Sequence, residues 1–138
     1  MTLPASFAVQ TALYAALEAD PALAAIGTDG VRFYDEVPED AGFPFVTLGE
    51  ARVSDYPGIP GARSHEVRLH AYSRWGGRAE LKRIEAAIKD ALHDADLQID
   101  GHTCEQCRFV FADVIRQPDL DTFAAVLRYR IVTTEAPA

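Results

Sequence analysis

Hydrophobic and polar positions follow two different periods along this chain. Near the N-terminus, Phe7, Leu13 and Leu17 recur at the spacing of one helix face, which predicts a helix over residues 2–19. Asp20-Pro21 ends it, because the residue before a proline is pushed out of the helical region. Residues 21–26 add a short helical turn. A second amphipathic helix is predicted over residues 78–93.

A period of two marks the strands. Val67, Leu69 and Ala71 alternate with polar residues, so residues 64–74 form a strand with one buried face. Asp100-Gly101 is expected to be a two-residue hairpin turn between Leu97–Ile99 and the next strand. The other predicted strands are residues 31–35, 43–55, 103–116 and 122–134.

The order α-β-β-β-α-β-β, with hairpins as its main connections, favours an α+β fold. We expect a mostly antiparallel sheet of four or five strands with two helices packed on one face. A chain of 138 residues without a linker predicts a single domain over residues 1–138, with a frayed tail at 135–138. Turn residues at 56–61 form the tip of a long hairpin.

Charge narrows the classes of partner. The formal net charge of -8 argues against binding to nucleic-acid phosphates and against docking on an anionic membrane. DNA can still pass nearby without being held. No apolar run reaches the roughly 18 residues of a membrane span. The N-terminus lacks the basic region of a signal peptide, so we expect a reducing compartment.

The strongest candidate for site chemistry is His102-x-Cys104-x-x-Cys107, whose spacing is compatible with zinc. A structural zinc site needs four ligands, and there is no second pair of cysteines. In a regular strand Cys104 and Cys107 face opposite sides. A redox pair normally sits at a helix N-terminus, which this one does not. We therefore interpret both as ordinary cysteines and expect neither catalytic residues nor a cofactor.

The polar face of the predicted sheet is the better candidate for function. Mixed charges and aromatic side chains on strand faces suit subunit contacts, although a plain solvated face is the alternative. A long hairpin with a Pro/Gly tip is also more than a core of this size needs. The candidate interface residues are Tyr56, Ile59, His65, Arg68, His70, Tyr72, Trp75, Arg128 and Arg130.

Three stretches carry a resemblance to a known family: AVQTALYAALEADPALAAI with VRFYDEVPEDAGFPFVTLGE, then SHEVRLHAYSRWGGRAELKRIEAAIKDALH, then RFVFADVIRQPDLDTFAAVLRYRI. In this order they resemble the tail-completion, or tail terminator, proteins of long-tailed phages and gene transfer agents. The resemblance covers most of the chain and includes no catalytic signature.

The resemblance implies a structural virion protein that is not an enzyme. Such a subunit forms a ring, usually hexameric, in the neck at the head-proximal end of the tail. The ring ends the tail tube and offers a surface to the head-side connector, and DNA passes through its lumen. Assembly in the bacterial cytoplasm is expected. The alternatives are another neck protein, such as a stopper or adaptor, and a small metal-binding module built on the cysteine pair.

The acidic composition fits a channel that does not hold DNA. If part of the negative charge lines the lumen, DNA is repelled and slides through. Glu36, Glu39 and Asp40 are candidates for the lumen because their loop is acidic.

Overall fold

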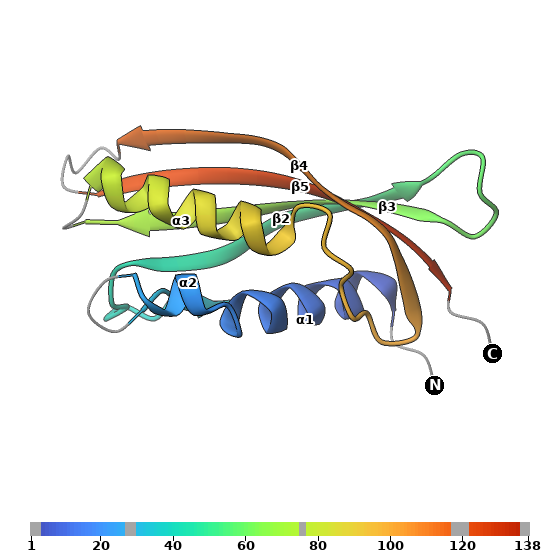
Figure 1. Cartoon of the computed structure of the whole chain (residues 1–138), viewed down its shortest axis with the longest axis horizontal. Helices are drawn as coiled ribbons and strands as arrows, with labels where there is room; N and C mark the ends of the chain where they lie inside the picture. Colours follow the sequence, from blue (N-terminus) through green and yellow to red (C-terminus); the bar gives the residue numbers. More distant parts are fainter. Residues whose placement is uncertain (1–3, 27–29, 75–76, 117–121, 136–138) are drawn as a thin grey trace.

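The computed structural model describes residues 4–26, 30–74, 77–116 and 122–135. Figure 1 shows one long, twisted sheet with all of its helices on the same side. The helices are α1 (Ala5–Glu18), α2 (Pro21–Ala24) and α3 (Gly77–Leu92), and the strands are β1 (Arg32–Tyr34), β2 (Phe45–Asp55), β3 (Arg63–Ser73), β4 (His102–Arg116) and β5 (Phe123–Glu135).

The five strands lie in the order β1-β2-β3-β5-β4. Only the short β1–β2 pair is parallel; the β2–β3, β3–β5 and β4–β5 pairs are antiparallel. Helix α3 carries the chain from β3 past the position of β5 to the outer strand β4. The predicted α+β class with a mostly antiparallel sheet is therefore confirmed.

The core lies between the helices and one face of the sheet. Leu13 and Leu17 of α1 pack in the same cluster as Ile84 and Ile88 of α3, and Leu69 and Leu127 supply the sheet side. All six side chains are at most 1% exposed. Burial of apolar surface on this scale is the main force holding the layers together. No helix in the described ranges is long and apolar enough to cross a membrane.

Local signals fix the helix ends as the sequence indicates. Pro4 precedes α1, and the Asp20 carboxylate accepts a hydrogen bond from the Leu23 backbone N–H at 3.0 Å, which caps α2. The predicted start of α1 at residue 2 lies outside the described residues. The other helix and strand bounds lie within about two residues of their predicted positions.

The prediction of a hairpin at Asp100-Gly101 is wrong for its first strand, while the turn and the second strand are present. Leu97–Ile99 is not a strand, although a turn is present and the His102 backbone N–H donates to the Ile99 carbonyl at 3.0 Å. Leu97 and Ile99 are each 5% exposed and belong to the core cluster. The segment is a connection whose side chains cover the core and whose backbone does not pair in the sheet.

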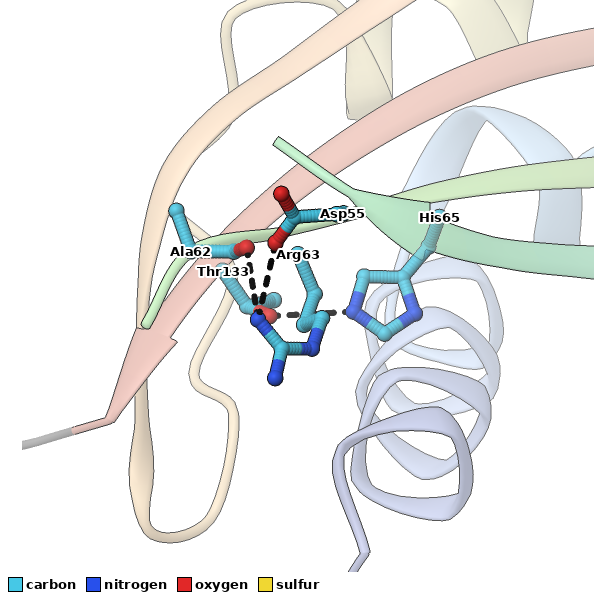
Figure 2. Close-up of polar contacts among 5 residues, drawn as sticks. All are labelled: Asp55, Ala62, Arg63, His65 and Thr133. Carbon is cyan, nitrogen blue, oxygen red and sulfur yellow. Dashed lines mark hydrogen bonds and ion pairs between the residues drawn. The ribbon is translucent and has the colours of Figure 1, made fainter. Parts of the chain in front are cut away.

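The β2–β3 hairpin extends beyond the helices (Figure 1). Its tip is a closed turn, because the Tyr56 N–H donates to the Ala62 carbonyl at 3.2 Å and the Ala62 N–H donates to the Ile59 carbonyl at 3.1 Å. At its base the Arg63 guanidinium donates to Asp55 at 3.3 Å and to the Ala62 carbonyl at 3.0 Å (Figure 2). The extension is therefore an ordered projection.

Candidate functional site

The face of the sheet opposite the helices is open and carries most of the predicted interface residues. Strand register places Arg68 beside Arg128, and His70 and Tyr72 lie on the same face of β3. Arg130 lies opposite Glu66 on this face. The structure thus brings Arg68, His70, Tyr72, Arg128 and Arg130 together on one surface, as the alternation predicts.

Two further arginines that the sequence analysis did not single out complete a basic band across this face. Arg52 of β2 lies opposite Glu66, and Arg108 of β4 lies opposite Arg130. We call this set the arginine face: Arg52, Arg68, Arg108, Arg128 and Arg130.

The contacts within the arginine face leave much of its charge available. Arg68 forms an ion pair with Glu50 at 3.2 Å, and Arg130 lies 3.7 Å from Glu66. The Arg128 guanidinium stacks over the Phe111 ring, 4.9 Å from its centroid. A polar hollow of about 530 Å³ lies at the β2 side of the band, with Arg52 and Glu50 in its lining.

Aromatic side chains occupy one end of the open face. Phe45 stacks on Tyr72 with ring centroids 4.9 Å apart, and it also contacts Phe43 and Tyr34 at 5.0 and 5.6 Å. The Arg74 guanidinium lies 4.4 Å from the centroid of the Phe43 ring. Tyr72 therefore contributes to a packed aromatic cluster, and it is only partly exposed.

His65 does not belong to the open face, and its predicted place there is wrong. It is 1% exposed and lies opposite Ile131, on the side of the sheet that the helices cover. Its Nε2 is 2.9 Å from Thr133 Oγ1 (Figure 2). Burial, and then the nearby His102, lower the pKa of His65 from its ordinary value. His65 lies two residues before Val67 and four before Leu69, so the alternation of the strand already places it on the buried face.

The remaining predicted interface residues lie apart from the band. Tyr56 and Ile59 are in the hairpin tip, where Ile59 is 44% exposed and Tyr56 is half-buried. Trp75 lies outside the described residues.

A β-bulge shapes the β2 side of the open face. Leu48 pairs with Leu69 and Ala51 with Val67, so Gly49 and Glu50 together oppose Arg68 alone. The bulge brings the Gly49 backbone against the His70 imidazole so closely that a Cβ on residue 49 would collide with the ring. A side chain at residue 49 would therefore force the His70 ring to move.

The cysteine pair has a geometry that regular alternation does not predict. A bulge at Glu105 pairs Cys104 with Thr133 and Cys107 with Ile131, so both cysteines lie on the helix side of the sheet. Within the described ranges, no group of three or more His, Cys, Asp and Glu side chains is placed to hold a metal ion. His102 instead contacts the Asp100 carbonyl at 2.9 Å.

The environment of the thiols is also unsuited to redox chemistry. Burial raises the pKa of Cys107 to about 12 and also raises the pKa of Cys104. A nucleophilic or metal-binding thiol must ionise near neutral pH. Both thiols are therefore held in their neutral form, and their interpretation as ordinary cysteines stays a prediction.

A second hollow lies on the helix side of the sheet, between α1 and the β2–β3 hairpin. Its volume is about 220 Å³, and Phe7, Leu13 and Val67 contribute to its mostly apolar lining. Phe7 is 54% exposed at its rim. It contains His65 but no arrangement of acid, base and nucleophile.

The acidic loop, residues 35–40, is exposed throughout. Asp35 accepts a hydrogen bond from the Gln10 side chain at 3.4 Å. No ion pair is found for Glu36, Glu39 or Asp40 within the described residues. The carboxylates of the loop are therefore exposed to solvent in the single chain.

The described residues form helices on one side of a sheet whose other face is open and charged, a kind of surface that suits contacts with other proteins. Comparison with known proteins makes this specific. The sequence model of the family described as tail completion protein gp17 matches residues 11–134. The chain therefore belongs to the tail completion protein family, which consists of structural tail proteins.

A solved structure supports the assignment over the full length. A chain of the virion of a native gene transfer agent particle superposes with a TM-score of 0.83 at 30% sequence identity. The superposition covers 98% of this chain and 100% of that chain. None of the curated protein sequences matches this chain.

Proposed function

We propose that this chain forms a homo-oligomeric ring, most simply a hexamer, at the head-proximal end of a phage-like tail. The ring ends the tail tube and joins it to the head-side connector. The observation that carries the proposal is the match of nearly the whole chain to the tail completion family and to a subunit of a gene transfer agent virion. A neck subunit of this kind is assembled in the bacterial cytoplasm.

The surface of the chain supports this role. Charged and aromatic side chains cover the open sheet face, and an ordered hairpin projects beyond the core with Ile59 exposed at its tip. Such surfaces suit contacts between subunits. The net charge of -8 fits a channel through which DNA passes without being held.

Deletion of the gene in cells that produce the particle tests the proposal. We expect unattached, DNA-filled heads and tails of abnormal length in electron micrographs, because nothing ends the tube or joins it to the head. Expression of the wild-type chain from a plasmid should restore joined particles. Particles of normal length and attachment in the deletion strain would refute the role.

A further inference from the structure

The arginine face is a concentration of positive charge on an acidic protein. It holds five of the thirteen basic residues, and the acidic residues that pair or form ion pairs with them are Glu50 and Glu66. Since the chain carries 21 acidic residues, the remaining surface is strongly negative. One face of each subunit is thus complementary in charge to the rest of another subunit.

Strand register makes the arginine face unfavourable when it is left uncovered. Arg68 lies directly opposite Arg128, and Arg108 lies directly opposite Arg130. Like charges directly opposite each other in a sheet are destabilising. Arg52 and Arg108 are exposed and have no ion-pair partner within the described residues. Additional carboxylates on this face would relieve the repulsion.

The acidic loop has the charge and accessibility to supply them. It presents four carboxylates within six residues, and Val37 among them is 46% exposed. An exposed apolar side chain among charges suits a contact with protein better than solvation alone. Guanidinium groups bind carboxylates in a bidentate geometry that adds both strength and orientation.

We propose that the arginine face of one subunit binds the acidic loop of a neighbouring copy. The inference rests on the proposed ring and specifies its contact. Because the two surfaces differ, the contact is head-to-tail, which is the kind that closes rings. It assigns Glu36, Glu39 and Asp40 to a subunit contact, in place of the lumen position that the sequence analysis considers.

Charge reversal with rescue tests the contact. In the deletion strain, Arg52→Glu with Arg108→Glu should reduce joined particles at least tenfold relative to the wild-type chain. Glu36→Lys with Glu39→Lys should do the same. A chain with all four substitutions should recover joined particles, because the two surfaces again have opposite charge. Lys82→Glu with Arg83→Glu on α3 is the control, since it makes the same charge change elsewhere.

The outcomes separate the contact from the function. Normal assembly with the reversed arginines would refute the contact while leaving the ring proposal intact. Loss without rescue would refute the acidic loop as the occupant. A deletion strain with normal particles would refute the proposed function itself. Purified variants should keep the wild-type melting temperature, which excludes misfolding.

Nucleic acid is the competing occupant of a basic face. Purified wild-type protein should show no binding to a short DNA duplex in a fluorescence anisotropy titration at low salt. Salt-sensitive binding that Arg52→Glu with Arg108→Glu removes would show that the arginine face is a DNA surface and would overturn the proposal.

Discussion

His65 is a titratable side chain buried in the helix-covered layer of the sheet. Its ring contacts the Thr133 hydroxyl at 2.9 Å, and burial lowers its pKa below the ordinary 6.5. In the unfolded chain the imidazole takes up a proton as the pH falls through 6.5. The folded protein resists that protonation until a lower pH, so the free energy of unfolding must fall in this range.

We therefore expect the wild-type protein to lose stability between pH 7 and pH 5, and His65→Gln to lose less. Glutamine keeps a side chain that can hydrogen bond to Thr133 but does not titrate. Urea midpoints at the two pH values measure the difference. Equal losses in both proteins would show that His65 does not contribute to acid sensitivity.

Gly49 and His70 form a steric pair at the bulge in β2. Because a Cβ at position 49 meets the imidazole and the half-buried ring must shift, Gly49→Ala should destabilise the protein by about 1 kcal/mol, the low end of the cost of overpacking. Chemical denaturation gives the value. In the His70→Ala background the same substitution should cost much less, since the ring is gone. An equal cost in both backgrounds would place its origin in the backbone.

The two cysteines show that strand alternation does not always predict the face on which a single residue lies. In a regular strand, positions three apart face opposite sides, so the sequence predicts Cys104 and Cys107 on opposite faces. The bulge at Glu105 adds one residue and returns Cys107 to the same side as Cys104. A second bulge between Phe109 and Phe111 shifts the parity again. Nothing in the local sequence marks either bulge.

At the level of elements, a buried hydrogen bond joins the end of β3 to the start of α3. The Ser73 hydroxyl donates to the Glu80 carboxylate at 2.6 Å, and the two residues are 0% and 8% exposed. The sequence gives no sign of this pair, because a serine and a glutamate seven residues apart are common on surfaces. Only the packing of the helix on the sheet encloses them.

Ser73→Ala should reduce the free energy of unfolding by about 1–3 kcal/mol, because a buried carboxylate oxygen loses its partner. Thermal and urea unfolding provide the measurement. Ser54→Ala, at an exposed position of β2, is the matched control and should change stability by less than about 0.5 kcal/mol. If both substitutions cost the same, the hydrogen bond does not join the elements.

Element prediction succeeds where the pattern is long and fails where it is short. The strand 64–74 and the helix 78–93 have many turns or repeats of one period, and both are confirmed as β3 and α3. Leu97–Ile99 offers only two apolar positions, which fit a strand and a buried connection equally well. The core decides between them, because both side chains are buried in the apolar cluster between helices and sheet.

On the scale of the whole molecule, the hairpin tip projects beyond the helices (Figure 1). Ile59 is exposed there on a turn whose backbone is internally hydrogen bonded. Ile59→Asp should leave stability within about 0.5 kcal/mol of wild type. If the tip contacts a neighbour or the tube, the same variant should sharply reduce joined particles, since a central apolar contact contributes about 2 kcal/mol or more.

Electron microscopy of complemented deletion strains measures this effect, and Ile59→Val is the conservative control. Wild-type numbers of joined particles with Ile59→Asp would show that the tip makes no essential contact. A lowered melting temperature would instead point to a role in folding.

The sequence by itself determined the class of the fold, the two main helices and the polar identity of one strand face. These features depend on short-range periodicity, which is visible within a window of neighbouring residues. It also indicated the tail completion family through an ordered series of segments, and the match to residues 11–134 confirms that indication.

Only the tertiary structure decided the strand order, the bulges and the enclosure of the Ser73–Glu80 hydrogen bond. Placing β5 between β3 and β4 joins residues far apart in sequence, so the arginine face exists only after folding. Arg52 and Arg108 belong to different strands, and only the sheet places them beside Glu66 and Arg130. Which strands pair depends on how whole faces of the sheet are buried. This involves residues far apart in sequence, so the local pattern does not predict it.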